Sequence, residues 1–195
     1  MEDDSELNEW LTSLGNVVQD KTGNNNNDDI SAADGLKHNV IALYFGADWS
    51  PPCSSYCKQL KESFDDLVER LAPLKIIYIT CDKTEDEYNR SVENLHENWF
   101  RVPLHNPIVD ELINKYEIMA IPKLVIIKDN GELITTRGRK ELQEKGTSAF
   151  RNWAIAANLS DWERKAVKQK TNDAKLVLKS LHALKNIKSL GANLS

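Results

Sequence analysis

Runs of consecutive apolar residues alternate along the chain with stretches in which apolar residues recur at helical spacing. Residues 40–45 and 74–81 are nearly continuous apolar runs, which is typical of strands buried on both faces of an α/β sheet. A third run at 123–128 is followed by the turn sequence Asp129-Asn130-Gly131 and a short apolar stretch at 132–136, which indicates a hairpin. The pattern therefore predicts three main strands and a hairpin partner.

Apolar residues at helical spacing predict helices around these strands. Residues 60–71 have one apolar face, and the proline pair at 51–52 suits the first turn of that helix, because a missing N–H costs nothing there. Further helices are predicted to open with residues 82–87 and to lie over 110–116 and over 146–157. Strands alternating with helices, then a hairpin and a final helix, indicate an α/β fold whose central mixed β-sheet is flanked by helices.

The patterning divides the chain into three parts. Residues 35–158 hold the predicted α/β domain. Residues 1–34 form an acidic arm, with nine acidic residues against one lysine, that contains an amphipathic helix over 7–18 and an Asn-rich linker at 23–29. Residues 159–195 form a helical extension in which basic residues dominate. We therefore expect one folded domain with a helical segment on each side.

The basic tail has its own sequence signals. Ser160-Asp161-Trp162-Glu163 fits a capping box at a helix start. Val177, Leu181, Leu184 and Ile187 give an amphipathic pattern on a basic background. Such a helix can dock on acidic lipid or on a partner helix, although a solvated helix face is the commoner explanation. Because aromatic residues for insertion are absent beyond Trp162, we do not expect a membrane partner.

Composition narrows the function classes. The 195 residues carry a net charge of −5 and three cysteines. An odd, small number of cysteines favours a reducing compartment, so we expect the cytoplasm and also consider the nucleus. No apolar run approaches the roughly 18 residues of a membrane span, and the first thirty residues lack a secretory pattern. The histidines are scattered, which argues against a metal site. The lack of a basic-aromatic stripe argues against nucleic-acid binding. We expect no cofactor.

The most informative motif is Trp49-Ser50-Pro51-Pro52-Cys53. It has the frame of a W-C-x-x-C dithiol motif with an oxygen in place of the first sulfur. In such a motif the first thiolate, stabilised at a helix N-terminus, attacks a substrate disulfide, and the second thiol resolves the mixed disulfide. The Ser50 hydroxyl is scarcely ionised at neutral pH and forms no disulfide. Cys53 keeps the resolving position, but the two-thiol cycle cannot start.

Two other cysteines bear on this question. Cys57 lies one turn beyond Cys53, at a spacing poorly aimed for a disulfide within an intact helix. Cys81 ends the second strand, so a Cys53–Cys81 pair is an alternative if the first two strands are parallel. The simpler interpretation is that Cys57 and Cys81 are small buried hydrophobic residues.

A second motif, Ala120-Ile121-Pro122-Lys123, directly precedes the third strand. Pro122 lacks the N–H that a central strand needs, so it belongs at the start of the strand. An ordinary strand-start proline and a cis peptide bond are both compatible with this position.

These two motifs together resemble the thioredoxin superfamily. Pro51-Pro52 and Thr80-Cys81-Asp82 before an acidic helix are similar to the tryparedoxin/nucleoredoxin branch. The residues that resemble the nucleoredoxin-like group, which includes rod-derived cone viability factor, are 120–135, Gly138-Arg139-Lys140 and Phe150-x-x-Trp153. The resemblance covers about residues 38–158.

The resemblance implies a thioredoxin fold and a protein-disulfide reductase ancestry. Trp49 would flank the site, Ser50 would occupy the position of the attacking cysteine, and Cys53 that of the resolving one. Pro51 and Pro52 belong to the motif, and the remaining implied residues are Ile121 and a cis Pro122, which would line the substrate groove. The partner would be a protein or peptide thiol or disulfide, and we expect a monomer.

Two functions remain open at this point. In one, the protein is a thiol–disulfide oxidoreductase by descent, disabled at residue 50 by natural loss or by an introduced Cys→Ser change. In the other, it is a non-catalytic module that binds or signals through an extended peptide added beside Ile121 and Pro122.

Overall fold

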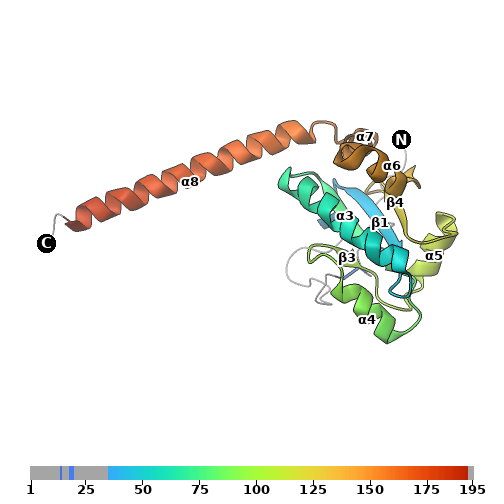
Figure 1. Ribbon diagram of the computed structural model, residues 1–195. Coiled ribbons are helices and arrows are strands. Elements are labelled where there is room, and N and C mark those ends of the chain that lie inside the picture. Colours follow the sequence, from blue (N-terminus) through green and yellow to red (C-terminus); the bar gives the residue numbers. More distant parts are fainter. Residues whose placement is uncertain (1–13, 15–17, 20–34, 193–195) are drawn as a thin grey trace.

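A five-stranded mixed sheet forms the centre of the molecule (Figure 1). The computed structural model describes Leu14, Val18, Gln19 and residues 35–192, with side chains as far as residue 180. The strand order is β3-β2-β1-β4-β5. The strands are β1 Val40–Gly46, β2 Leu74–Thr80, β3 Phe100–Arg101, β4 Lys123–Ile127 and β5 Leu133–Thr135. The first three are parallel, whereas β4 and β5 are antiparallel to their neighbours.

Helices pack on both faces of this sheet, and one extends away from it (Figure 1). Their bounds are α3 Pro51–Glu69, α4 Glu85–Glu93, α5 Ile108–Lys115, α6 Gly138–Lys145, a 3-10 turn Gly146–Ser148, α7 Ala149–Ala156 and α8 Trp162–Ala192. Most of α8 projects alone, beyond the end of α3.

The sheet separates two apolar cores. On one face, residues such as Ala42 and Ile76 pack with Phe64 of α3 and with Phe150 and Trp153 of α7. The opposite core is formed by the alternate strand residues, by α5 and by two residues of the N-terminal arm; it includes Ile41, Leu43, Ile77, Val125, Leu112, Leu14 and Val18. Because successive side chains of a strand point to opposite faces, the continuous apolar runs of the sequence fill both cores.

The topology brings the two sequence motifs to one edge of the sheet. Parallel β1 and β2 end together, with Gly46 opposite Thr80. Antiparallel β4 begins there, with Lys123 opposite Phe45. The loop that follows β1 and leads into α3 therefore leaves the same edge at which residues 121–122 enter the sheet.

The predicted α/β order with a mixed sheet is confirmed, but several details differ. The helix expected over 146–157 starts as a 3-10 turn and is preceded by α6, a helix that was not predicted. The capping box expected at Ser160 is wrong, because α8 begins at Trp162 and Glu163 accepts hydrogen bonds from Arg151 instead. Of the predicted N-terminal helix, only Leu14 and Val18 lie within the described residues, and both are buried.

Candidate functional site

Ser50 occupies the N-cap position, directly before the first residue of α3. Its backbone is extended, with φ −105° and ψ 99°, and its side chain makes no capping hydrogen bond. Its carbonyl accepts from the N–H groups of Cys53, at 2.8 Å, and Ser54, at 3.4 Å. The side chain is buried, with 7% exposed. Position 50 thus lies at the positive end of the helix dipole, where an anion would be stabilised.

The prolines explain how α3 begins at this point. Pro51 and Pro52 occupy the first helical positions and are exposed. They contribute no N–H, so the first amide available in the helix is that of Cys53. The double proline therefore fixes the helix start immediately after Ser50 and leaves few amide donors beside it.

Cys53 lies inside the molecule, one turn into α3. Its side chain is only 2% exposed, and its carbonyl accepts a 3.0 Å hydrogen bond from the Tyr44 hydroxyl. Burial raises the pKa of Tyr44 above its usual value, and the neighbouring thiols of Cys57 and Cys53 add to the rise, so Tyr44 remains a neutral hydrogen-bond donor. Shielding of this kind suits a resolving position and disfavours direct attack by Cys53 on a bulky substrate.

Trp49, in contrast, is half exposed. Its indole Nε1 donates a 3.3 Å hydrogen bond to the carbonyl of Cys81, which fixes one edge of the ring to the end of β2. The rest of the indole is exposed, and Trp49 directly precedes Ser50 in the sequence. It is available as an apolar contact for a partner.

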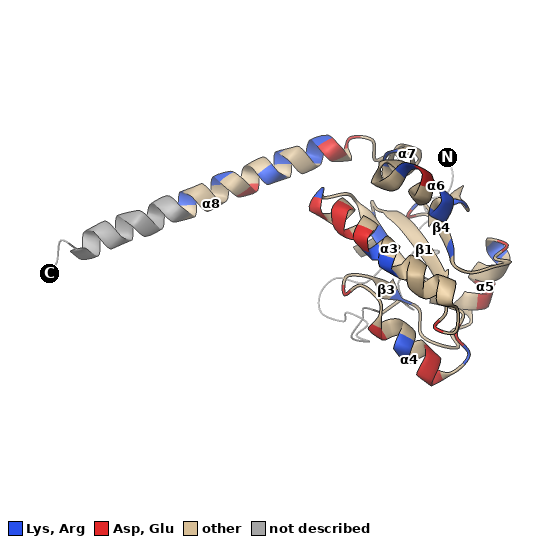
Figure 2. Cartoon of the chain, viewed as in Figure 1, with Lys and Arg blue, Asp and Glu red and all other residues tan. Residues whose placement is uncertain are grey.

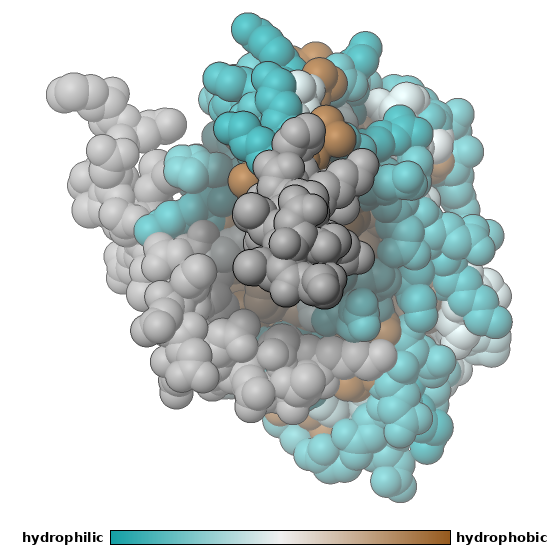
Figure 3. Space-filling model, turned by 90° about the vertical axis from the view of Figure 1, so that its left-hand side faces the viewer, coloured by the Kyte–Doolittle hydropathy of each residue, from teal (hydrophilic) through white to brown (hydrophobic). Residues whose placement is uncertain are grey.

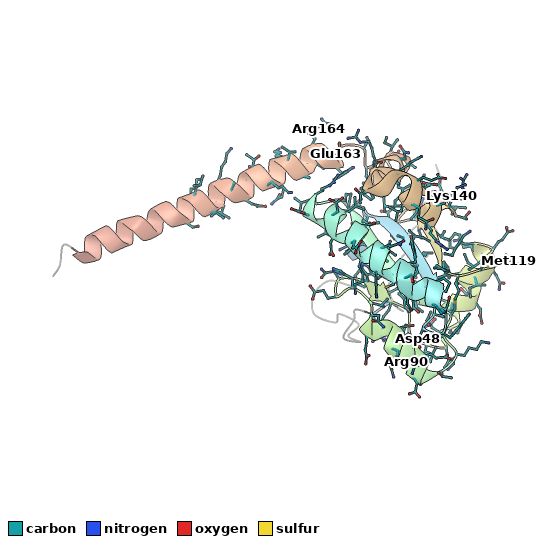
Figure 4. The ribbon with its side chains drawn as sticks, viewed as in Figure 1. Asp48, Arg90, Met119, Lys140, Glu163 and Arg164 are labelled. Atoms are coloured by element: carbon teal, nitrogen blue, oxygen red, sulfur yellow. The ribbon has the colours of Figure 1, made fainter. Side chains whose placement is uncertain are left out.

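A buried carboxylate, which the sequence analysis missed, holds the loop in place. Asp82 is buried at the end of β2. Its Oδ1 accepts from the N–H of Asp48 at 2.7 Å, and its Oδ2 accepts from the hydroxyls of Ser91 and Thr80 at 2.6 and 2.9 Å. Asp48 in turn forms an exposed 2.8 Å ion pair with Arg90 of α4 (Figure 4). The network joins β2, α4 and the loop before Trp49.

One signal in the sequence indicates this role. Thr80 and Asp82 are two residues apart at the end of a buried strand, so their side chains can lie on the same face. The sequence pattern instead placed Asp82 at the start of a helix. In the structure α4 begins later, at Glu85, and a capping box between Thr84 and Glu87 closes its N-terminus.

None of the three cysteines forms a disulfide bond. Cys57 is buried, with its Sγ 3.7 Å from the carbonyl oxygen of Asn94. Cys81 is partly exposed and packs against the core that contains α5. Burial raises the pKa of the Cys81 thiol to about 11, and the nearby Cys53 and Asp82 contribute to the rise. The expectation of a small buried residue thus describes Cys57 but only partly describes Cys81, and Cys53 and Cys81 are not bonded.

Ile121 and Pro122 join at a cis peptide bond directly before β4. The carbonyl of Pro122 accepts a long 3.5 Å hydrogen bond from Arg139 Nη1, and the Arg139 guanidinium lies 5.4 Å from the ring centre of Tyr56 in α3. Arg139 thereby connects the loop before β4 with the helix that starts at the W-S-P-P-C motif. This contact, too, was not predicted from the sequence.

An open groove of about 630 Å³ lies beside Pro122. Its charged lining residues are the cations Lys123, Arg137, Arg139 and Lys140 and the acids Glu117 and Glu144. Met119, which is 93% exposed, adds an apolar side chain at the rim and projects outward from the loop after α5 (Figure 4). The groove beside Pro122 therefore combines an exposed apolar side chain with charged ones.

Among the residues that the structure describes, no group of three His, Cys, Asp or Glu side chains could hold a metal ion. In the same part of the chain, no helix has the length and apolar content to cross a membrane.

The site presents an open groove beside Pro122 and one shielded thiol, that of Cys53, but no sulfur at position 50. A hydroxyl at the helix N-terminus can donate or accept a hydrogen bond, whereas thiol–disulfide exchange requires a thiolate. Trp49, Ser50 and Cys53 belong to one continuous loop-and-helix unit, and Ile121 and Pro122 enter the sheet at the same edge.

Comparison with known proteins gives the site its context. A family model described as thioredoxin-like matches residues 38–133. Nucleoredoxin-like protein 1 of Mus musculus is 29% identical over 131 residues, which are 65% of this chain and 60% of the mouse protein. The chain spans less than two thirds of the length of the curated nucleoredoxin relatives that it matches.

Solved structures agree with this result. Thioredoxin from Wuchereria bancrofti is 31% identical, and the match covers 74% of this chain and 98% of that structure with a TM-score of 0.59. Tryparedoxin I from Leishmania major is 26% identical, with 72% and 94% covered and a TM-score of 0.61. The expected thioredoxin fold is therefore confirmed, and the chain belongs to the thioredoxin-like family, in which nucleoredoxin-like proteins and tryparedoxins are among its relatives.

Proposed function

We propose that this chain is a nucleoredoxin-type protein that binds protein or peptide thiol–disulfide partners and, with Ser50 at the attacking position, does not turn them over. Its family is of the thiol-oxidoreductase type, so the scaffold is that of a protein-disulfide reductase. The catalytic cycle of such a reductase needs an attacking thiolate and a resolving thiol. This chain keeps the second at Cys53 and lacks the first.

The observation that carries the proposal is the environment of Ser50. The residue caps α3, directly before two prolines, with Cys53 buried one turn later. This is the geometry in which a helix N-terminus depresses the pKa of a cysteine. The backbone and the resolving position thus support reductase descent, and the serine oxygen is the reason that the proposal assigns no turnover to this chain.

The partner surface in this proposal includes Trp49, Ile121 and Pro122. An extended peptide would pair with the backbone before β4, as in other strand-addition complexes. The exposed face of Trp49 would cover an apolar side chain of the peptide, and Met119 would provide a second apolar contact. Neither contact requires sulfur chemistry.

The test is to restore the missing sulfur. Ser50→Cys is expected to reduce insulin disulfides with dithiothreitol as donor. With the unchanged chain, the rate of insulin reduction is expected not to exceed the rate with dithiothreitol alone. The matched control is Ser50→Cys/Cys53→Ser, which has an attacking thiol but no resolving one and is expected to stop at a mixed disulfide. A folded Ser50→Cys protein without reductase activity would contradict reductase descent at this site.

The second candidate is a non-catalytic binding module that binds its partners without the Cys53 thiol. The shielding of Cys53 favours it, because a thiol with 2% exposure contributes little to a partner's surface. In this case Cys53→Ala recovers the same partners in pull-downs as the unchanged protein, while Trp49→Ala loses them. Partner capture that depends on Cys53 supports the thiol-linked function instead. Three free thiols suit a reducing compartment, so the proposal assigns the protein to the cytoplasm, with the nucleus as an alternative.

A further inference from the structure

Among the described residues, the contacts between α8 and the rest of the protein lie in the first turns of the helix. Trp162 and Ala166 are buried in the core that contains α7, and the Trp162 ring lies 5.3 Å from that of Phe150 in an edge-on arrangement. Lys170 Nζ makes one further contact, a hydrogen bond to the carbonyl of Glu69 at the end of α3. Beyond this point the helix projects away from the sheet and its covering helices (Figure 1).

The projecting part exposes apolar side chains. Val167, Leu176, Val177 and Leu178 are each between 57% and 67% exposed. At about 100° per residue, the three consecutive residues from 176 to 178 cover about 200° of the helix circumference. One packed helix or groove covers a narrower stripe. Figure 3 shows the side of the molecule toward which α8 projects, where small brown apolar patches lie among a mostly teal polar surface.

The same helix is strongly basic. Within residues 162–192 the basic residues are Arg164, Lys165, Lys168, Lys170, Lys175, Lys179, Lys185 and Lys188, against the two acids Glu163 and Asp173. Figure 2 shows this excess of blue over red along the described part of α8. Pairing of two α8 helices from separate copies would bring these like charges together, which disfavours self-association along the helix. The occupant of this face is therefore an acidic one.

We propose that α8 lies in the plane of an acidic membrane surface. A wide apolar sector can sink into the boundary between headgroups and acyl chains at several rotations of the helix, whereas packing against one helix covers a narrower stripe. The flexible stems of Lys175 and Lys179 let their ammonium groups reach anionic headgroups while the apolar side chains remain below. A helix of 31 residues, about 46 Å long, provides an extended contact.

This inference differs from the expectation drawn from the sequence. The tail was not assigned a membrane partner, because it has no aromatic insertion face beyond Trp162. The structure places Trp162 inside the protein core, so it is an anchor for α8 and not an inserting residue. The aliphatic residues 176–178 take over the apolar contact.

The experiment is co-sedimentation of the full chain with vesicles. The probes are pure phosphatidylcholine and phosphatidylcholine containing about 30 mol% phosphatidylserine. The protein is expected to sediment with the anionic vesicles only, and to dissociate as NaCl rises from about 0.05 M to about 0.5 M. Lys175→Glu/Lys179→Glu is expected to lower the apparent affinity about tenfold or more. Leu176→Ser/Leu178→Ser tests the apolar contribution and is also expected to weaken binding.

Matched controls separate α8 from charge and hydrophobicity elsewhere. Lys58→Glu/Lys83→Glu changes the net charge equally at exposed sites on α3 and before α4, and Val68→Ser/Leu133→Ser removes exposed apolar residues. Both are expected to bind like the unchanged protein. Binding that is lost equally in the controls, or is absent with anionic vesicles, would overturn the proposal. So would a dimer, measured by light scattering, that Leu176→Ser/Leu178→Ser abolishes while vesicles remain unbound.

Discussion

The backbone N–H of Asp48 donates a 2.7 Å hydrogen bond to Oδ1 of Asp82. This bond fixes the loop before Trp49 to the end of β2, and the hydroxyls of Ser91 and Thr80 hold the other carboxylate oxygen. A buried carboxylate surrounded by donors is costly to alter, because each donor left unpaired loses its hydration as well as its partner. The position of Trp49 and Ser50 therefore depends on a residue outside the W-S-P-P-C motif.

We predict that Asp82→Asn destabilises the fold by about 2–3 kcal/mol, because an amide cannot accept from all of these donors and places its own N–H groups among them. Urea unfolding with an unchanged slope would measure the loss. Asp86→Asn is the same substitution at an exposed position of α4 and is expected to leave the midpoint unchanged. Equal effects of the two substitutions would contradict the role given to Asp82.

A second prediction concerns close packing at the start of α6. A Cβ added at Gly138 would lie 2.9 Å from side-chain atoms of Ile126 and from the backbone oxygen of Leu124. Because the backbone oxygen cannot move aside without disturbing β4, Gly138→Ala is expected to cost about 1–3 kcal/mol. Gly35→Ala is the matched control, since a Cβ there meets nothing within 4 Å. Thermal unfolding that is equally affected by both changes would show that α6 can shift away from β4.

The sequence predicted the central strands well for a physical reason. Residues 40–45 and 74–81 are apolar on both faces because β1 and β2 lie in the middle of the sheet, between two cores. The edge strand β3 is only Phe100–Arg101, too short to produce a period. Helix α6 was missed because its residues are mostly polar and its buried side chain is Leu142, so no apolar stripe marks it.

The site was predictable to the extent that it is local in sequence. Residues 49–53 and 121–122 form recognisable motifs, and their backbone positions follow from the strand order. The Arg139 contacts with Pro122 and Tyr56, and the Asp82 contact with Asp48, join residues between 17 and 83 positions apart. No periodicity in a single sequence reports such pairs, because each depends on how the sheet is ordered.

A third prediction concerns the pH dependence of Cys81. Burial raises the pKa of the Cys81 thiol to about 11, and the nearby Cys53 and Asp82 contribute to the rise. The thiol is therefore neutral at pH 7. Its alkylation by iodoacetamide is expected to accelerate about tenfold per pH unit until the pH nears 11, because the thiolate is the nucleophile. Mass spectrometry of the peptide that contains Cys81 would measure the rate. The unfolded chain in guanidinium is the control, where the same thiol is expected to titrate with the ordinary cysteine pKa of about 8.5.

The sign of the linked stability follows from the same shift. Because the folded state favours the neutral thiol, the contribution of Cys81 is fully present below the unfolded pKa and is lost as the pH rises through about 11. Cys81→Ser, whose hydroxyl does not titrate in this range, is expected to flatten this part of the stability profile. A Cys81 alkylation rate that levels off near pH 8.5 in the folded protein would contradict the assignment.

The final prediction separates two contacts that attach α8. Trp162 is buried against Phe150, whereas Glu163, which is labelled in Figure 4, forms an exposed ion pair with Arg151 at 2.8 Å. Burial of a large aromatic side chain contributes far more than an exposed ion pair, which water and salt screen. Trp162→Ala is therefore expected to cost about 3 kcal/mol in urea unfolding and to speed tryptic cleavage at Arg164 and Lys165. Glu163→Gln is expected to leave both measurements unchanged, and the reverse order of effects would mean that charge, and not the aromatic anchor, holds α8 to the core.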